Sequence, residues 1–300
     1  VDLNRTPGRY LLTGSANVFL LPRLSESLAG RMEIFTLWPL SQGEFGGISE
    51  KFIDHMFSEK SLSIASIPVD TETTIIERAI RGGYPEAAAR MSEPRRRAWF
   101  GSYITTILQR DVRDIANIDG LTAMPRLLSM LATRSASLLN YSELSRATGL
   151  PQSTLKRYMA LFETIFLIDH VPAWYSNLGK RLVKTSKLVM NDTGLLATLL
   201  AVNAGRLENN PLCGALIENF VIMELKKQIT WSDTRPVMHH YRTQTGQEVD
   251  AVLEDAAGRI VGIEIKSAKS VGAQDLRGLQ SLAEVSGSSF LRGIVLYGGS

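Results

Sequence analysis

The chain has 300 residues, which at roughly 150 residues per domain is enough for two or three domains with a core in each. Hydrophobic residues make up 44% and charged residues 21%, and this ordinary globular composition excludes a disordered or fibrous chain. The formal charge of +3 is too small to indicate nucleic-acid binding by itself. The single cysteine, Cys213, excludes an intramolecular disulfide and a cluster of cysteine metal ligands.

Membrane insertion is not expected. The longest stretches without Asp, Glu, Lys or Arg are Tyr10–Pro22 and Thr193–Gly205, each of 13 residues. A transmembrane helix needs about 20 apolar residues, and no basic-then-apolar secretory leader opens the chain. We therefore expect a cytoplasmic protein with no membrane partner.

The first predicted element is a buried strand over Tyr10–Leu12 that ends in the polar turn Thr13–Ser15. Such an apolar strand normally lies within a parallel sheet, so its neighbours are expected in sequence upstream of this chain. A hairpin with a later segment is the alternative. A helix is predicted around Arg23–Ala29, and a second strand over Met32–Trp38.

The middle of the chain is predicted to be mainly helical and carries the positive charge. Ser41 and Glu44 have the spacing of a capping box. Residues 50–118 have a helical pattern that is interrupted at Gly82–Pro85. Between Arg81 and Arg157 there are twelve Lys or Arg and six Asp or Glu residues, a net charge of +6. A solvated helix face and a phosphate-binding surface both explain this excess.

Residues 141–166 have the pattern of a helix-turn-helix. Ser142 and Ser153 are the expected helix caps, and Gly149–Pro151 separates the two helices. In the first helix, Leu144 and Ala147 are expected to point inward. In the second helix, one apolar stripe contains Leu155, Tyr158, Met159, Phe162 and Ile165.

Two apolar runs, Phe166–Val171 and Lys187–Met190, would supply the strands of a wing, so the sequence predicts a winged helix. Winged helices bind DNA but also serve as protein-contact modules. If this one contacts DNA, the residues expected to do so are Gln152, Thr154, Lys156 and Arg157.

The last hundred residues are predicted as helix, three strands, helix, strand. The first helix is Pro211–Ile229, with Glu218 at the start of an apolar stripe. The strands are Val237–Thr243, Glu248–Leu253 and Ile260–Lys266, with Gly246 and Gly258 in the turns between them. A helix containing Leu276, Leu279 and Leu282 and the strand Ile294–Tyr297 follow.

Acidic side chains and one lysine are expected to converge on these strands. Asp250 and Glu264 lie on neighbouring strands, and Lys266 shares a face with Glu264 because side chains alternate along a strand. Converging carboxylates are costly to bury unless compensated, and they suit a hard divalent cation such as Mg²⁺. Such a cation would activate a water for attack on a phosphodiester. A surface ion pair between Glu264 and Lys266 is the alternative.

This arrangement resembles the PD-(D/E)xK, or restriction-endonuclease-like, superfamily. The matching residues are Asp250, Glu264 and Lys266, with Glu218 as the acid on the helix; Val249 precedes Asp250 where many members have proline. The resemblance implies that Asp250 and Glu264 bind the metal and that Lys266 activates water. Because some members with intact motifs do not cut, cleavage is left open.

A wider resemblance covers nearly the whole chain and is to prokaryotic AAA-type ATPases whose C-terminal half is a domain of unknown function with a nuclease-like fold. The matching segments are YLLTGS, ESLAGR, PLSQGEF, GGYPE, RDVRDI, KTSKLVMNDTGLL, LIENFVIMEL, EVDAVL and IEIKSA. The resemblance makes Thr13 and Ser15 the polar end of a sensor strand near the γ-phosphate of ATP. It makes Arg31 a nucleotide contact, across a subunit boundary if the protein self-associates.

No G-x-x-x-x-G-K-[ST] loop is present, so this chain is not expected to hydrolyse ATP without the rest of a longer protein. The predicted fold class is α/β multidomain. We expect a remnant of the AAA-type domain at 1–48, a helical lid or linker at 49–120, a winged helix-turn-helix at 121–191 and a nuclease-like domain at 192–300. Three functions are considered: a DNA-binding ATPase with a Mg²⁺-dependent nuclease-like domain, a non-catalytic regulatory ATPase in which that domain is a scaffold, and a chain that only binds DNA.

Overall fold

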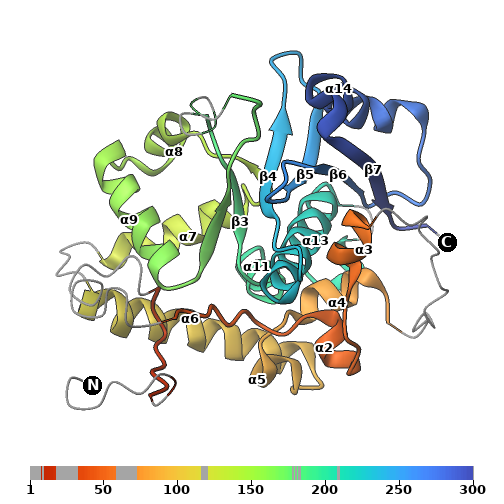
Figure 1. The fold of residues 1–300 in the computed structure, drawn as a ribbon. Coiled ribbons are helices and arrows are strands. Elements are labelled where there is room, and N and C mark those ends of the chain that lie inside the picture. Colours follow the sequence, from red (N-terminus) through yellow and green to blue (C-terminus); the bar gives the residue numbers. More distant parts are fainter. Residues whose placement is uncertain are drawn as a thin grey trace.

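The computed structural model describes residues 8, 10–17, 33–58, 73–115, 121–177, 179, 181, 184–207 and 210–299. The protein is of mixed α/β class. A three-stranded sheet and a four-stranded sheet lie on either side of a long central helix (Figure 1).

The first part of the chain is helical. Its helices are α2 (Gln42–Gly46), α3 (Phe52–Phe57), α4 (Ile75–Arg81), α5 (Pro85–Ala88) and α6 (Glu93–Ile115). The expected capping box is confirmed, because Ser41 Oγ accepts a hydrogen bond from the Glu44 amide and the Glu44 carboxylate accepts one from the Ser41 amide. The expected interruption at Gly82–Pro85 separates α4 from α5.

Both strands predicted near the start are absent from the described residues. Tyr10–Leu12 and residues 33–38 are irregular, and the side chains of Leu11, Phe35 and Leu37 are exposed. A strand is stable only when its backbone pairs with a neighbour, and no strand of the described residues pairs with either segment. The predicted helix around Arg23–Ala29 and the residue Met32 lie outside the described residues.

A helical pair and a small sheet follow. The elements are the 3₁₀ turn η2 (Leu121–Ala123), α7 (Met124–Ala132), β1 (Ser137–Leu138), α8 (Tyr141–Thr148), α9 (Gln152–Thr164), β2 (Ile168–Val171) and β3 (Lys187–Met190). Strand β3 lies in the middle of the sheet and is antiparallel to both β1 and β2.

The turn between α8 and α9 and the buried stripe of α9 are as expected. Gly149 ends α8 with a positive φ of 74°, a conformation that glycine adopts without strain. All five predicted stripe residues of α9 are buried. The predicted caps were wrong: Asn140 caps α8 through its side chain, and Pro151 precedes α9 with no side-chain cap. The prediction that Ala147 points inward was wrong: its side chain is exposed, although a spacing of three residues places it on the same side of α8 as the buried Leu144.

The remaining elements form the last part of the molecule. They are α11 (Thr193–Leu199), α12 (Ala204–Leu207), α13 (Leu212–Trp231), β4 (Val237–Arg242), β5 (Glu248–Glu254), β6 (Ile260–Lys266), η3 (Ala273–Leu276), α14 (Arg277–Ser286), η4 (Gly287–Ser289) and β7 (Phe290–Tyr297). The sheet order is β4-β5-β6-β7, with only the β6–β7 pair parallel. The predicted helix and strand order of this region is therefore confirmed.

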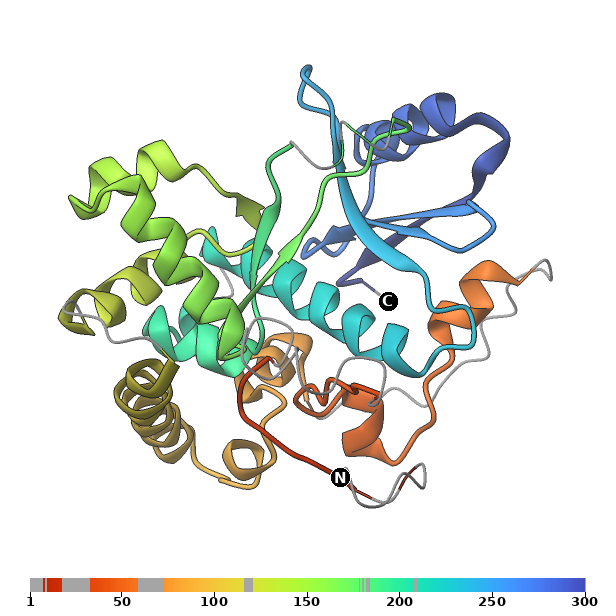
Figure 2. The same cartoon turned by 60° about the vertical axis from the view of Figure 1, so that its left-hand side comes forward.

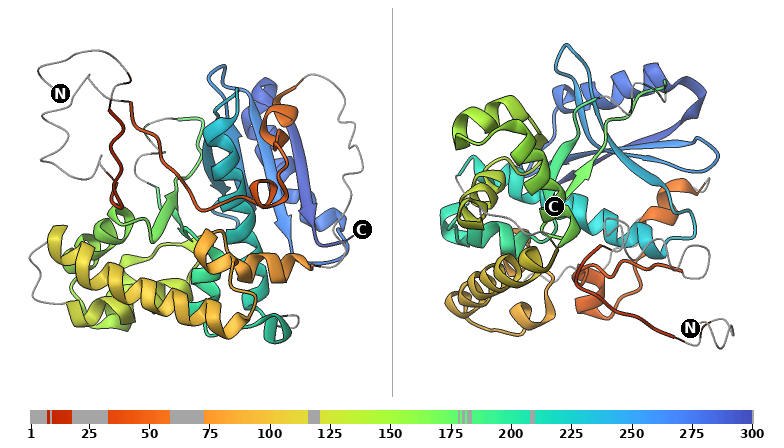
Figure 3. Two further views of the ribbon diagram at one scale, coloured as in Figure 1. Left: turned by 90° about the horizontal axis from the view of Figure 1, so that it is seen from below. Right: turned by 90° about the vertical axis from the view of Figure 1, so that its left-hand side faces the viewer.

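Helix α13 lies at the centre of the molecule, between the two sheets (Figures 2 and 3). It contacts β3 on one side and β5 and β6 on the other, and most of its surface is buried rather than one stripe. Helix α14 packs against the opposite face of the larger sheet. There, a Cβ atom added to Gly278 would lie 1.7 Å from the carbonyl oxygen of Glu248, so only glycine permits this close approach to β5.

A segment near the start of the chain is attached to α13 by polar groups. We call the four residues that make this attachment, Leu40, Gln42, Glu224 and Lys227, the brace. The Gln42 amide donates to Glu224 Oε2 (2.7 Å), and Lys227 Nζ donates to the Leu40 carbonyl oxygen (3.0 Å). Glu224 and Lys227 also pair with each other at 2.7 Å. The brace joins residues nearly 190 positions apart in sequence, so residues 39–46 are part of the folded core.

Candidate functional site

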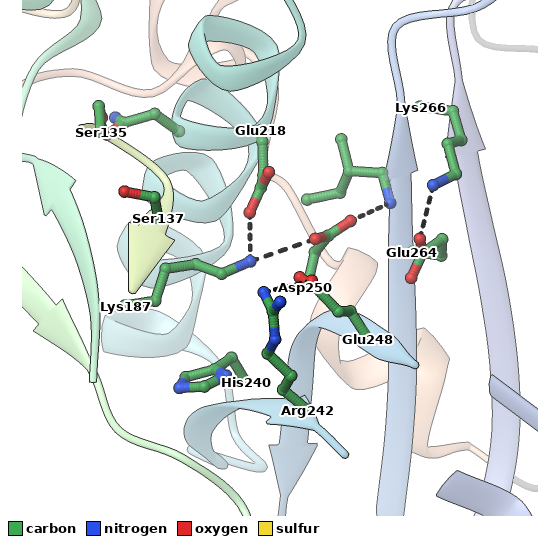
Figure 4. Close-up of polar contacts among 12 residues, drawn as sticks. Ser135, Ser137, Lys187, Glu218, His240, Arg242, Glu248, Asp250, Glu264 and Lys266 are labelled. Atoms are coloured by element: carbon green, nitrogen blue, oxygen red, sulfur yellow. Dashed lines mark hydrogen bonds and ion pairs between the residues drawn. The ribbon is translucent and has the colours of Figure 1, made fainter. Parts of the chain in front are cut away.

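Asp250 of β5 and Glu264 of β6 lie opposite each other, as the sequence predicted. The antiparallel register pairs Ala251 with Ile263, so the next pair outward is Asp250 with Glu264. There the backbone ladder ends, and the Ile265 amide donates instead to Asp250 Oδ2 at 2.9 Å. This hydrogen bond holds the Asp250 carboxylate at the junction of the two strands (Figure 4).

Glu218 reaches the same place from α13, but its direct partner is a lysine that sequence reasoning did not select. The Nζ atom of Lys187, the first residue of β3, forms ion pairs with Glu218 Oε1 and, at 3.2 Å, with Asp250 Oδ1. Figure 4 shows the ammonium lying between the two carboxylates. The side chain of Lys187 is only 4% exposed. We call Lys187, Glu218, Asp250, Glu264 and Lys266 the carboxylate–lysine cluster.

Strand β3 is held against α13 at its other end as well. The side-chain amide of Asn219 accepts from the Met190 amide (2.7 Å) and donates to the Met190 carbonyl oxygen (2.8 Å). Asn219 thus pairs with β3 as a neighbouring strand would, one residue after Glu218. Together these contacts fix the backbone from which Lys187 projects.

Lys266 contacts Glu264 rather than Asp250. Its Nζ atom lies 2.7 Å from Glu264 Oε1 and 4.0 Å from Asp275 Oδ1, and its side chain is 32% exposed. The other oxygen of Glu264, Oε2, is buried and has no hydrogen-bond partner. A buried carboxylate oxygen without a partner is costly, so this atom marks the place where a donor or a cation would be most stabilised.

Burial and mutual repulsion raise the pKa values of two carboxyl groups in the cluster. Burial, followed by the charge of Asp250, raises the pKa of Glu218 to about 8 and that of Glu264 to about 7. Lys187 and Lys266 oppose these shifts. Burial would lower the pKa of Lys187, but Glu218 and Asp250 outweigh it and raise that pKa, so the ammonium stays charged.

The histidine next to the cluster contributes no positive charge near neutral pH. Burial and the charge of Lys187 lower the pKa of His240 to about 4. Its Nε2 atom lies 3.1 Å from the Thr185 carbonyl oxygen. Arg242 and Glu248, also drawn in Figure 4, pair with each other at 2.5 Å and cancel in charge. The charge balance of the site is therefore set by the five residues of the cluster.

As arranged here, the cluster does not fit a divalent cation. Within the described ranges, no group of three or more His, Cys, Asp and Glu side chains is placed to hold a metal ion. Both oxygens of Asp250 already accept from protein donors, Lys187 and the Ile265 amide. Glu264 Oε2 is the one oxygen of the Asp250–Glu264 pair without a partner. Metal binding by Asp250 and Glu264 would require Lys187 Nζ to move away from Asp250.

The residues predicted to contact nucleic acid lie on the first two turns of α9. Gln152, Lys156 and Arg157 are exposed, and Thr154 is half-buried. Lys156 Nζ lies 5.8 Å from the centre of the Tyr141 ring, and Gln152 Nε2 donates to Ser142 Oγ at 3.2 Å. Helix α9 lies on the side of the molecule away from the larger sheet (Figure 2).

The predicted nucleotide contacts are not brought into a site by the described residues. Thr13 and Ser15 are exposed on irregular backbone, and Arg31 lies outside the described residues. Contact of these three residues with ATP stays a prediction, as does the division into four domains.

Comparison with known proteins supports an AAA-type ATPase-like family that carries a domain of unknown function. Residues 1–46 match the model of an AAA domain, residues 72–206 that of a domain of unknown function (DUF8612), and residues 213–300 that of another (DUF4143). The family models thus extend over most of the chain and agree with the wider resemblance drawn from its motifs.

Two curated relatives come from mycobacteria. They are the uncharacterized protein Rv2008c of Mycobacterium tuberculosis and the uncharacterized protein Mb2031c of Mycobacterium bovis. Each is 31% identical over 267 residues, which is 89% of this chain and 54% of the relative. The chain therefore spans about half the length of these relatives. No solved structure matches it significantly. Among the described helices, none combines the length and apolar character needed to cross a bilayer.

Proposed function

We propose that this chain is the C-terminal part of an ATP-binding protein of AAA type, in which residues 121–191 form a DNA-binding winged helix and residues 192–300 a nuclease-like domain. The observation that carries the proposal is the placement of Asp250 opposite Glu264, with Lys266 two residues further along β6. This is the juxtaposition that the PD-(D/E)xK resemblance requires. The AAA-domain match at residues 1–46 supports ATP binding by the longer protein, with self-association through its ATPase domain.

The chemistry proposed for this site is hydrolysis of a phosphodiester. Mg²⁺, when bound, would supply charge stabilisation at the phosphate. Within this chain, Asp250 is oriented by the Ile265 amide, and the Lys266 ammonium lies beside Glu264, where it can hold a water. Before a cation binds, the raised pKa of Glu264 allows this carboxyl group to carry a proton near neutral pH, which it would release on coordinating the metal.

The order of elements from β1 to β3 supports the winged-helix assignment. A short strand, two helices joined by a tight turn and an antiparallel strand pair follow one another, and the pair returns to β1. Exposed Lys156 and Arg157 provide charge near the start of α9, the helix that would enter a groove.

Cleavage is tested with the whole chain, Mg²⁺ or Mn²⁺, and single- and double-stranded DNA and RNA. We expect products that disappear with a chelator and in Asp250→Asn, and that persist in Asp169→Asn, a control whose carboxylate pairs with Lys226 outside the cluster. Products that are the same in the chelator, or in Asp250→Asn, would refute the nuclease assignment.

DNA binding is tested by the salt dependence of affinity. Substituting both Lys156 and Arg157 by alanine should weaken binding and reduce the log–log salt slope by up to about 1.8, since each phosphate contact contributes about 0.9. A matched control removes the same charge from exposed Lys51 and Arg206, which lie outside both α9 and the carboxylate–lysine cluster. An equal effect of both double substitutions would contradict a contact made through α9.

One observation favours the second candidate function, a regulatory ATPase whose nuclease-like domain does not cut. Lys187 already pairs with Glu218 and Asp250, which leaves the cluster with an internal cation. For this candidate, Asp250→Asn and Lys266→Ala should leave the activity of the full-length protein unchanged.

A further inference from the structure

Lys187 is the residue of the cluster that the proposed function does not use. It comes from β3, in the sheet that follows α9, and not from the strands that carry Asp250 and Glu264. Its ammonium nevertheless lies between Glu218 and Asp250, the position at which a cation would be attracted by both carboxylates (Figure 4). We infer that Lys187 takes the place of a divalent cation in this cluster and competes with any metal ion for Asp250. The inference rests on the proposed function in that it concerns the same carboxylates.

The charges of the cluster support this competition. With every group ionised, three carboxylates and two ammonium groups sum to −1. A divalent cation added to that set would bring the cluster to +1, with two ammonium groups close to the metal. With Lys187 absent, the same cation would bring it to zero. Two cations a few ångströms apart in a buried site repel strongly, because the protein interior screens charge far less than water does.

Lys187 is held in this position, whereas Lys266 is not. The Lys187 side chain is 4% exposed, its strand pairs on both edges, and Asn219 fixes the end of that strand to α13. The Lys266 side chain is 32% exposed and can turn toward water. A cation can therefore reach Asp250 only if the Lys187 side chain moves away. A ligand that shifts β3 relative to α13 would open the site.

A second observation is an unsatisfied acceptor within the cluster. Glu264 is 6% exposed, and its Oε2 atom has no hydrogen-bond partner. Lys187 Nζ pairs with Asp250 Oδ1, the Ile265 amide donates to Asp250 Oδ2, and Lys266 Nζ pairs with Glu264 Oε1, but none of these donors reaches Glu264 Oε2. A cation bound between Asp250 and Glu264 after Lys187 had moved would satisfy this atom.

The test is calorimetric titration of the whole chain with MnCl₂ and MgCl₂, accompanied by thermal unfolding with and without the metal. Lys187→Gln should bind Mn²⁺ at least about tenfold more tightly than the wild type, because one repelling charge is gone. It should also gain more thermal stability from the metal. Lys227→Gln is the matched control, since Lys227 is also buried and paired with a glutamate of α13 but lies outside the cluster. Its metal affinity should equal that of the wild type.

Two further variants separate this inference from the proposed function. Lys187→Gln combined with Asp250→Asn should lose the gained affinity. If Lys187→Gln does not fold, Lys187→Gln with Glu218→Gln removes the pair as a unit and should still bind Mn²⁺ more tightly than the wild type.

Equal Mn²⁺ affinity in the wild type and Lys187→Gln, abolished by Asp250→Asn, would overturn the inference and leave a metal-dependent site standing. No binding by either protein would overturn the inference and also remove the metal from the proposed function.

Discussion

Helix α13 carries two groups of buried charge, and they differ in how completely they are satisfied. In the brace, both oxygens of Glu224 accept hydrogen bonds, from Gln42 and Lys227, and Lys227 donates to two acceptors. In the carboxylate–lysine cluster, one ammonium serves two carboxylates, and Glu264 keeps an oxygen without a partner. The two groups lie on the same helix, six residues apart at Glu218 and Glu224.

Burial of charge alone therefore does not mark a functional site in this molecule. The brace attaches residues 39–46 to the core, and both oxygens of its carboxylate are satisfied within it. The cluster has more carboxylates than ammonium groups, and burial raises the pKa of Glu218 and Glu264. Unsatisfied acceptors and raised carboxyl pKa values at one place are typical of binding and catalytic sites.

The largest expected effect is the loss of stability when either buried lysine is removed. Lys187→Met and Lys227→Met should each lower the free energy of unfolding by about 3 to 5 kcal/mol, because an uncompensated carboxylate is left in the interior. Urea unfolding followed by circular dichroism near pH 8 measures this loss.

Double substitutions then distinguish the two groups. Adding Glu224→Gln to Lys227→Met should restore most of the lost stability, since Glu224 is the carboxylate that pairs with Lys227, and the nearby buried Asp192 keeps its hydrogen bonds from the Gly83 and Leu195 amides. Adding Glu218→Gln to Lys187→Met should restore only part, because Asp250 still lacks its partner. Equal recovery in both pairs would contradict the difference between a closed pair and an open cluster.

The sequence predicted the placement of Asp250 and Glu264 but missed the contacts of Lys187, and the reason is physical. Asp250 and Glu264 lie fourteen residues apart on strands joined by a turn at Gly258, so alternation and the turn position place them opposite each other. Lys187 meets Glu218 and Asp250 across 31 and 63 residues, in a contact made by tertiary packing. The only local indication that Lys187 belongs to the cluster is that it is a charged residue at the start of a strand whose four residues are all buried.

The same distinction explains the wrong strands near the start of the chain. In Tyr10–Leu12 and residues 33–38 the apolar pattern is that of a strand, but pattern shows only what a segment would bury if a neighbour were present. In the last hundred residues each predicted strand has a neighbour close in sequence, and every one forms. Local pattern thus predicts a strand correctly where a pairing partner is present, as for β6 and β7, whose parallel pairing spans a helix, and fails where the described residues provide none.

The next effect in size is a dependence of stability on pH. The raised pKa values of Glu218 and Glu264 contribute to it, and so do those of buried Asp192 and of Glu50 outside the cluster. The pKa of Glu218 rises from 4.5 to about 8 on folding, so the folded protein keeps a proton that the unfolded chain releases. The free energy of unfolding should therefore fall as pH rises from about 5 to about 8, by up to about 1.4 kcal/mol per pH unit for each retained proton. Urea unfolding at intervals across this range measures the slope.

Glu218→Gln should flatten this slope in part, with the remainder due to Glu264, whose pKa is raised to about 7, and to Asp192 and Glu50, whose pKa values burial also raises. Glu224→Gln, on the same helix in the brace, is the comparison: it should leave the contributions of Glu218 and Glu264 unchanged and lower only that of Glu50, whose pKa the charge of Glu224 helps to raise. Lys187 does not contribute in this window, because its pKa is raised above 10.5 and its stabilisation is lost only at higher pH. Stability that rises between pH 5 and pH 8 would contradict the raised carboxyl values.

The smallest predicted effect concerns the cap next to the brace. Ser41 Oγ accepts from the Glu44 amide at the start of α2 and donates to the Glu50 carboxylate. Ser41→Ala should lower the free energy of unfolding by about 1 kcal/mol, the usual cost of losing a helix cap. Ser41→Thr, which keeps a hydroxyl group, should lose less.

If the brace and the cluster are energetically independent, the effect of Ser41→Ala should not reach the cluster. Ser41→Ala introduced into Lys187→Gln should therefore leave its Mn²⁺ affinity within about twofold, since distant sites with no shared partner act independently. A larger change in affinity would mean that α13 transmits the state of residues 39–46 to Glu218. In that case the brace would couple the AAA-like end of the chain to the cluster as well as anchor it.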